Sequence, residues 1–217
     1  MQELIKEFAK LDSAAISDAL DSFKISCGLV GIKPLFPNIK CVGFAYTVKY
    51  QEIKEITEFQ NAGNYIDNVP DNSVIVIDND GRNDCTVWGG ILTEVAMKKK
   101  INGTVINGCA RDIDEISKKK YPLFAVSTFM QSAKNRSKKV SEALPIFINN
   151  VKIETGDIIF CDGNGCIVIP IKLASDVLQR AKNVIETEDK ILNAVRNGMN
   201  LEEARKIYSY NKPWEKK

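Results

Sequence analysis

The sequence predicts an α/β fold with a C-terminal helical extension, and three observations predict it. Patterns typical of strands and of helices alternate up to about residue 128. Short apolar segments separated by turn residues follow them, and a charged amphipathic region covers residues 172–208. We expect one domain over residues 1–217, with a core at about 13–170 and C-terminal helices at about 171–208.

The first expected elements are a helix, a strand and a second helix. Ser13 is a favourable N-cap for a helix over residues 14–20, whose apolar side chains group on one side. Residues 41–50 (CVGFAYTVKY) have the composition of a strand, in which Gly43 marks a bulge or a close approach of another segment. A second helix is expected over residues 52–61.

The middle of the chain predicts a β-α-β arrangement. The strand there begins directly after a helix ends, so it runs back toward the amino-terminal end of that helix. The expected elements, in order, are a strand at 73–77, a helix at 91–99, a strand at 104–106, a helix at 112–119 and a strand at 122–128.

The last third of the core predicts a β-meander followed by helices. Turn residues such as Asn149-Asn150 separate short apolar segments. The strands are expected at 145–148, 151–154, 158–161 and 167–169. The helical region after them is expected to break at Asn197-Gly198.

The chain contains no histidine, which excludes several kinds of site. Ser-His-Asp and Cys-His catalysis, His-ligated zinc and the usual proton shuttle near neutral pH all need that side chain. Any catalysis must therefore use carboxylates, Lys, Arg, Tyr, Cys, backbone amides, water or a bound metal. Carboxylate ligands favour a hard cation such as Mg²⁺ or Mn²⁺.

Charge and composition limit the partners that we expect. The 30 basic and 28 acidic residues give a formal net charge of +2, so no electrostatic feature favours nucleic acid or an anionic membrane. Local lysine clusters are interpreted as solvated helix ends. No apolar stretch approaches the ~20 residues that span a bilayer, and the first residues form no signal core, so we expect a cytoplasmic protein. The six cysteines lack metal-ligand spacing and are expected to be reduced and buried.

The segment WGGILTEVAMKKKINGTVINGCARDIDE combines two features at the ends of one helix-strand unit. Gly89-Gly90 opens a helix, where unpaired N–H groups and the helix dipole favour an anion. The following strand leads to Arg111-Asp112, a cation that grips carboxylates and a carboxylate that holds hard metals. The alternatives are a turn that needs glycine and a surface ion pair in which Asp112 caps its own helix.

Several motifs in order resemble the RraA-like family, named for the regulator of ribonuclease E activity A. The similarity covers about residues 13–170, and the motifs are SAAISDAL, VGFAYTVK, SVIVIDNDG, WGGILTEVA, INGTVINGCARDIDE and TGDIIFCDGNGCIVIP. The family includes metal-dependent 4-hydroxy-4-methyl-2-oxoglutarate aldolases with oxaloacetate decarboxylase activity. The resemblance implies a swivelling β/β/α domain, a homotrimer or hexamer with sites between subunits, and a lyase that forms a pyruvate enolate from a 2-oxo acid.

The resemblance also assigns residues. In the family, the backbone at the Gly-Gly turn binds the substrate carboxylate, and the corresponding positions are Gly89, Gly90, Ile91 and Leu92. Arg111 corresponds to the arginine that binds substrate, and Asp112 to the aspartate that anchors the divalent metal, Mg²⁺ or Mn²⁺. Arg111 and Asp112 are therefore the expected catalytic residues.

The sequence departs from the family pattern where an aldol base is needed. Some aldolases carry a carboxylate where this chain has Gly90, and an aspartate is common where Asn107 stands. Asp84 and Glu115 are candidates for residues behind the site, whereas Asp162 is interpreted as a turn former. A neighbouring subunit contributes an acidic residue in the family, and the candidates here, each also compatible with a solvated helix face, are Glu186, Glu188, Glu202 and Glu203.

Two other functions compete with the lyase. A non-catalytic regulator would bind an RNA-degrading enzyme by protein contact, as the member that gave the family its name does. A quinone methyltransferase has less support, because no G-x-G-x-x-G loop follows a strand.

Overall fold

The computed structural model describes residues 2–55 and 63–214. In this part of the chain the strands form one nine-stranded mixed sheet and one separate two-stranded hairpin. The main path through the large sheet is β1 (Lys33–Pro34), β6 (Leu123–Thr128), β5 (Gly103–Ala110), β3 (Ser73–Asp78), β2 (Cys41–Glu52), β10 (Ile158–Asp162) and β11 (Gly165–Ile169). Two further strands join this sheet, β4 (Thr86–Trp88) beside β5 and β7 (Ser137–Glu142) beside β2.

The parallel strands β2, β3, β5 and β6 form the centre of the sheet. All six residues of β3 are buried, as expected for a continuous apolar strand covered on both faces. Its side chains alternate between two apolar clusters, with Val74 and Val76 in one and Ile75 and Ile77 in the other. The carboxyl ends of these parallel strands meet at one edge, where ligands of α/β proteins tend to bind.

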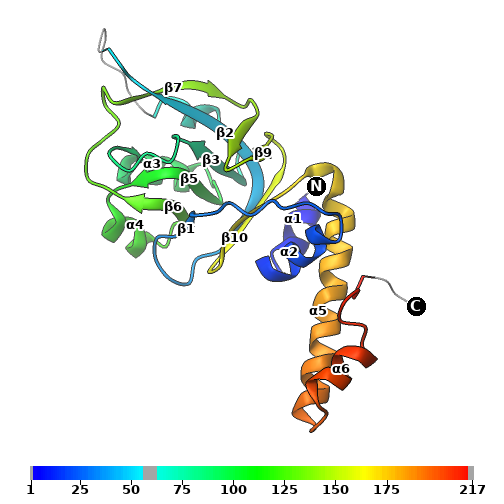
Figure 1. The fold of residues 1–217 in the computed structure, drawn as a ribbon. Helices are drawn as coiled ribbons and strands as arrows, with labels where there is room; N and C mark the ends of the chain where they lie inside the picture. Colours follow the sequence, from blue (N-terminus) through cyan, green and yellow to red (C-terminus); the bar gives the residue numbers. More distant parts are fainter. Residues whose placement is uncertain (1, 56–62, 215–217) are drawn as a thin grey trace.

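Helices cover the two faces separately (Figure 1). On one side lie α3 (Gly90–Lys98) and α4 (Ile113–Lys119), which follow β4 and β5. The other helices form a bundle at the far side, where the long α5 extends away from the sheet and α6 folds back beside its distal half. Their bounds are α1 (Gln2–Phe8), α2 (Ser13–Asp21), α5 (Ala174–Arg196) and α6 (Leu201–Ile207). None of the helices within the described residues is both long and apolar enough to cross a membrane.

Several expectations about individual elements are confirmed. The helix break at Asn197-Gly198 lies between α5 and α6, and Asn200 caps α6 by accepting from two backbone N–H groups. Gly43 is a close approach, because a Cβ there would lie 2.7 Å from the backbone oxygen of Asn72. The strand expected at 104–106 exists but is longer and continues as β5 through Ala110.

The N-cap of α2 was assigned wrongly. Asp12, one residue earlier, accepts a 2.8 Å hydrogen bond from the Ala15 N–H. Ser13 instead donates from both its backbone N–H and its hydroxyl to the carboxylate of Asp162, at 2.9 and 2.8 Å. Asp162 also accepts from the Asn164 N–H, so its turn role is confirmed and it joins the β10–β11 turn to α2.

The helix expected at 52–61 is wrong at its start, because Glu52 still belongs to β2 and residues 53–55 are not helical. Residues 56–61 of that expected helix lie outside the described residues. The predicted meander is also wrong. β8 (Ile146–Ile148) and β9 (Val151–Ile153) form the separate hairpin, whereas β10 and β11 join the main sheet.

Among the α-helices and strands, four elements, α1, β1, β4 and β7, were not predicted. β7 pairs with β2, but it has the polar sequence SKKVSE and only one buried residue. Its sequence therefore shows no apolar alternation that would predict a strand. β4 is three residues long. The backbones of both strands find their hydrogen-bond partners in neighbouring strands. Residues of β4 also contribute to the candidate site.

Candidate functional site

The start of α3 and the end of β5 lie side by side, as the β-α-β expectation requires. The Arg111 N–H donates to the Trp88 carbonyl at 3.0 Å, and the Gly90 N–H donates to Asp112 Oδ2 at 2.8 Å. Two segments separated by 22 positions are thereby joined at the carboxyl end of a parallel strand. The helix amino terminus, a guanidinium and a carboxylate converge there.

Asp112 occupies the N-cap position of α4, but its side chain bonds to α3. Its backbone is left-handed, with φ 62°, and its side chain makes no capping bond to α4. The carboxylate instead lies against the positive amino-terminal end of α3, where an anion is favourable. The interpretation of Asp112 as the cap of its own helix is therefore wrong. Its ion pair with Arg111 is loose, with 3.8 Å between Arg111 Nε and Asp112 Oδ2.

A side chain at either glycine would crowd the charged groups of the site. Gly89 has an extended backbone, with φ −166°, which any residue adopts. A Cβ on Gly89 would lie 2.7 Å from Asp112 Oδ2 and 3.2 Å from Arg111 Cγ. A Cβ on Gly90 would lie 3.2 Å from Glu115 Oε2 and 3.5 Å from Asp112 Oδ2. Side chains at these positions would therefore press on the charged groups of the site.

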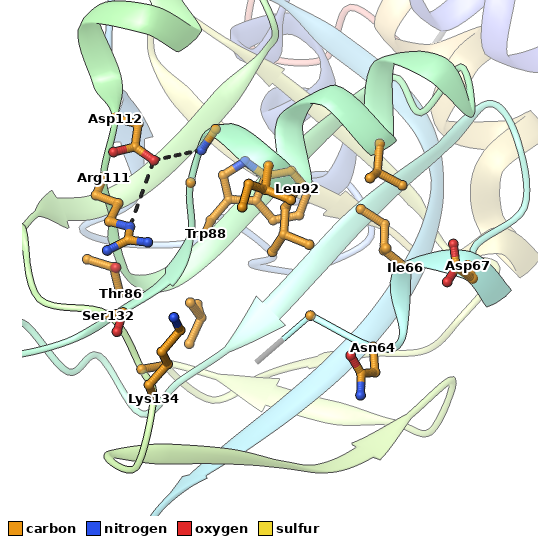
Figure 2. A pocket seen from close by; sticks show the side chains of 17 residues that line it. Asn64, Ile66, Asp67, Thr86, Trp88, Leu92, Arg111, Asp112, Ser132 and Lys134 are labelled. Carbon is orange, nitrogen blue, oxygen red and sulfur yellow. Dashed lines mark hydrogen bonds and ion pairs between the residues drawn. The ribbon is translucent and has the colours of Figure 1, made fainter. Parts of the chain in front are cut away.

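A cavity of about 460 Å³ opens beside these residues (Figure 2). Its size suits a small organic ligand. Trp88 is part of its wall and is fixed by a 3.0 Å bond from Nε1 to Thr93 Oγ1 and by stacking on Tyr121. The side chains of Arg111 and Asp112 are 39% and 42% exposed, so a ligand reaches both. They also line a second hollow, of about 360 Å³, together with Phe129 and other residues.

The expected carboxylate-binding positions belong to the first turn of α3. The helix geometry leaves the N–H groups of Ile91 and Leu92 without an intrahelical acceptor, whereas the Gly90 N–H is used by Asp112. The chain therefore presents two N–H groups at the positive end of a helix. All of Gly89, Gly90, Ile91 and Leu92 line the larger cavity.

The donor set suits a hard divalent cation with water as its main ligand. Within the described ranges, no group of three or more His, Cys, Asp or Glu side chains is placed to hold a metal ion. Asp112 supplies a single accessible carboxylate. Mg²⁺ usually keeps several waters and uses one or two protein carboxylates, so this arrangement fits Mg²⁺ or Mn²⁺ and does not fit a site made of protein ligands alone.

The remaining acidic candidates divide into near and far groups. Glu115 lies beside Gly90 and pairs with Lys119 at 2.7 Å. Asp84 does not line the cavity and forms a two-point ion pair with Arg82, which lowers the pKa of the Asp84 carboxyl. The far group lies on α5 and α6 and does not line this cavity. Its members are Glu186, Glu188, Glu202 and Glu203.

Asn107 has a supporting position. Its Nδ2 donates to Asp78 Oδ1 at 2.8 Å, and Lys49 approaches Asp78 Oδ2 at 2.6 Å. Asp78 is 2% exposed, so these bonds satisfy a buried carboxylate behind the strand ends. An aspartate at position 107 would place a second negative charge against Asp78, whereas the Asn107 amide donates a hydrogen bond to it.

The cysteines are all free and buried, as expected. Burial raises the pKa of the Cys85 and Cys109 thiols, which keeps them protonated. A thiolate nucleophile therefore has no support at these two positions.

Sequence reasoning missed the opposite wall of the cavity, formed by Thr86, Ser132 and Lys134. Thr86 belongs to β4, and Ser132 forms an isolated parallel bridge with it. No spacing in the sequence links positions 86 and 132, because the pairing of β4 with this segment exists only in the folded chain.

The comparisons with known proteins agree with this architecture. The model of the RraA-like family (Aldolase/RraA) matches residues 13–168. Protein DlpA of Legionella pneumophila is 46% identical over 215 residues, which are 99% of this chain and 35% of DlpA, so the chain spans about a third of that relative. A Halalkalibacterium halodurans protein named "Putative 4-hydroxy-4-methyl-2-oxoglutarate aldolase" is 31% identical over 182 residues, 83% of this chain and 82% of that protein.

A solved structure is similarly close. The crystal structure of an uncharacterized protein from Pseudomonas syringae pv. tomato superposes with a TM-score of 0.86 at 46% identity. The match covers 94% of this chain and 98% of that one. The family model, the relatives and the fold agree, and the chain belongs to the RraA-like family.

Proposed function

We propose that the protein is a metal-dependent carbon–carbon lyase that acts on 2-oxo acids and forms a pyruvate enolate. The observation that carries this proposal is the convergence of Arg111, Asp112 and the first turn of α3 on one cavity. A cation, an accessible carboxylate and free helix N–H groups match the charges of a 2-oxo acid and a divalent metal. The aldolase name of the relative from Halalkalibacterium halodurans supports the same class.

Each group has a distinct proposed role. The N–H groups of Ile91 and Leu92 and the α3 dipole bind the carboxylate next to the carbonyl. Asp112 holds Mg²⁺ or Mn²⁺, which supplies Lewis acidity when bound. Arg111 donates to the carbonyl oxygen and stabilises the negative charge that develops on it as the carbon–carbon bond breaks.

Decarboxylation is the reaction that these groups support best. In oxaloacetate the C3–C4 bond breaks, its electron pair moves into the enolate, carbon dioxide leaves, and a proton from water then gives pyruvate. This sequence needs no base. Aldol cleavage requires removal of a proton from the leaving hydroxyl, and position 90 carries no carboxylate. Glu115, beside Gly90, is the nearby carboxylate for that second reaction.

We also propose a homotrimer or hexamer. Ile91 is 82% exposed and Met130 is 71% exposed, and both lie at the cavities that Arg111 and Asp112 line. The proposed assembly rests chiefly on the family to which the chain belongs, and a subunit that covered these two side chains would bury their apolar surface. Light scattering coupled to size exclusion should give a mass that is a multiple of three chains, and a monomer would contradict the assembly.

The decisive experiment is oxaloacetate decarboxylation by the purified protein. Pyruvate release is measured with Mg²⁺, with a chelator, and in the Arg111→Ala and Asp112→Ala variants, each against a protein-free control with the same metal. Turnover that needs metal and is lost in both variants would support the lyase. No metal-dependent turnover from a well-folded protein would contradict it and would direct attention to a protein-binding role.

A further inference from the structure

A separate pocket lies away from the candidate site, where α2, α5 and the segment that follows α6 meet. Figure 1 shows this segment returning along α5 toward the level of α2. The pocket has a volume of about 210 Å³, which is small for a drug-sized ligand and suits an occupant of few non-hydrogen atoms. We call it the α2–α5 pocket, and its polar and aromatic lining residues include Asp18, Asp21, Thr187, Glu188, Tyr210 and Trp214.

Three carboxylates of this pocket have no cationic partner within the described residues. Asp18 and Asp21 lie one turn apart on α2, and Glu188 lies on α5, which packs against α2. No lysine or arginine of the described chain forms an ion pair with any of the three. By contrast, Glu186 on the same helix pairs with Lys190 at 2.8 Å. The α2–α5 pocket therefore gathers negative charge that the described side chains leave unpaired.

The surroundings of these carboxylates oppose their negative charge. Burial, and then repulsion from Asp21 and Asp12, raises the pKa of the Asp18 carboxyl. Burial, and then repulsion from Asp18 and other carboxylates, raises the pKa of the Glu188 carboxyl. Asp18 and Asp21 also lie in the last turn of α2, where the helix dipole disfavours an anion and no basic residue stands. Arrangements that lower stability in this way are expected where a function needs them.

A buried hydroxyl in the α2–α5 pocket is also unused. Thr187 lines the pocket and is 9% exposed, and its hydroxyl makes no hydrogen bond within residues 2–55 and 63–214. Buried hydroxyls are normally bonded to protein, water or a ligand, so this one calls for a partner in the pocket. Its oxygen can accept a hydrogen bond from a cationic N–H donor. Thr187 precedes Glu188 directly, so both groups lie on the same turn of α5.

The lining favours an organic cation over a metal ion. Tyr210 and Trp214 supply aromatic rings, whose faces attract ammonium and guanidinium groups. Arg205 already lies over the Tyr210 ring, 4.8 Å from its centroid, which shows that this ring accepts a cation. The carboxylates, in contrast, are not placed to hold one metal ion together, because the part of the chain that the structure describes contains no such group of acidic side chains. Carboxylates that are spread apart match a ligand with more than one positive centre.

We propose that the α2–α5 pocket binds a small aliphatic diamine. One ammonium group pairs with Asp18 and Asp21 at the carboxyl end of α2, where the helix dipole favours a cation. The other ammonium group pairs with Glu188 and donates to Thr187 Oγ1. The methylene chain between them packs against the Trp214 ring, which is half-buried.

This proposal does not depend on the proposed lyase function, because none of the residues that line the α2–α5 pocket lines the cavity beside α3. A bound diamine would remove the repulsion among the carboxylates that face each other from α2 and α5. Binding to the folded chain alone should therefore raise the melting temperature.

The test is a calorimetric titration of the full chain with putrescine, a four-carbon diamine, at constant ionic strength. We expect a Kd below about 1 mM. Butylamine, which has one ammonium group, should bind at least about tenfold more weakly, and butanediol and Mg²⁺ should not compete. Tryptophan fluorescence gives a second readout, because Trp88 is the one other tryptophan and lies outside the pocket. Putrescine should change the emission of the wild type but not that of Trp214→Phe.

Substitutions separate binding from folding. Asp18→Asn and Glu188→Gln should each weaken putrescine binding about tenfold, the lower end of the range for a lost charged hydrogen bond, because both side chains are partly exposed. The same two variants should raise the melting temperature of the ligand-free protein, because they remove repulsion, so weaker binding would not reflect misfolding. Asp189→Asn is the matched control, since Asp189 is exposed on the same helix and does not line the pocket. Its affinity should stay within about twofold of the wild type.

Four results would overturn the site. They are no putrescine binding below about 10 mM, equal affinity for butylamine, displacement of putrescine by an equal concentration of Mg²⁺, and unchanged affinity in both Asp18→Asn and Glu188→Gln. Each is measured without any assay of turnover, so failure of this site and failure of the proposed lyase function are independent outcomes.

Discussion

Replacing Gly89 with alanine tests the site through a single methyl group. The backbone at Gly89 is extended, so alanine brings no backbone strain. The new Cβ would lie 2.7 Å from Asp112 Oδ2, 3.2 Å from Arg111 Cγ and 3.3 Å from Arg111 Nε. The three atoms nearest to the methyl group therefore all belong to the two side chains to which we assign catalysis.

The structure gives the size of the effect. Ordinary contacts begin at 3.4 Å, so the carboxylate has to retreat by roughly 0.7 Å from its 2.7 Å position. That movement stretches the Gly90 N–H···Asp112 bond, which belongs to a class that contributes about 1.5–3 kcal/mol when buried. Asp112 is 42% exposed, so water replaces much of the lost bond and we expect the stability to fall by less than about 1 kcal/mol. Misplacing reacting groups by a similar distance typically costs about 100-fold in rate.

The assay compares urea unfolding, Mn²⁺ binding by calorimetry, and oxaloacetate turnover in Gly89→Ala. The control is Gly28→Ala, because a Cβ at Gly28 meets nothing within 4 Å and its φ is not positive. We expect Gly89→Ala to lose at least tenfold in turnover and to bind Mn²⁺ more weakly, while both variants unfold cooperatively. Wild-type turnover and metal affinity in Gly89→Ala would refute the assignment of Asp112 and Arg111 to the site.

Four further outcomes follow from the same contacts. Arg111→Ala should lower kcat/KM at least 100-fold, because loss of one oxyanion donor costs about 3 kcal/mol, as measured by pyruvate release. Thr86→Val should stabilise the protein by about 1 kcal/mol in urea unfolding, since it removes a buried hydroxyl without a partner among the described residues. Gly43→Ala should destabilise the fold by about 1–3 kcal/mol, because its Cβ would lie 2.7 Å from a backbone oxygen. Lys49→Met should lower the free energy of unfolding by about 2 kcal/mol, because it leaves the 2% exposed carboxylate of Asp78 without its cation. The loss is smaller than for a fully buried ion pair, because Lys49 is partly exposed.

Each of these outcomes has a result that contradicts it. A kcat/KM within tenfold of the wild type in Arg111→Ala would contradict the role of Arg111 as a donor to the developing oxyanion. Destabilisation by Thr86→Val would mean that the hydroxyl has a partner, such as an ordered water. Unchanged stability in Gly43→Ala or Lys49→Met would contradict, respectively, the close approach of strands or the need of Asp78 for a cation.

Local patterns predicted the parallel centre of the fold well. The apolar run of β3 and the helix-strand unit from α3 to β5 carry their own periodicity, and turn residues mark their ends. The strands β4 and β7 could not be predicted in this way. Their residues pair because neighbouring strands offer free backbone groups, and that information is not local.

The sequence by itself determined the family, the absence of histidine chemistry and the pairing of Gly89-Gly90 with Arg111-Asp112. These follow from residue identity and from the short β-α-β connection, which brings its two ends together in any right-handed crossover. Only the structure shows that the Asp112 carboxylate lies on the α3 amino terminus and that its backbone is left-handed.

Only the tertiary structure decided the second wall of the cavity. Thr86 and Lys134 are 48 positions apart, and they line one cavity because β4 pairs with the segment that follows β6. Backbone hydrogen bonds between distant segments form only after the sheet has assembled, and they leave no periodic trace in the side chains. The second wall of the cavity is therefore encoded by strand pairing, whereas the charges that we assign to the reaction itself lie within one motif.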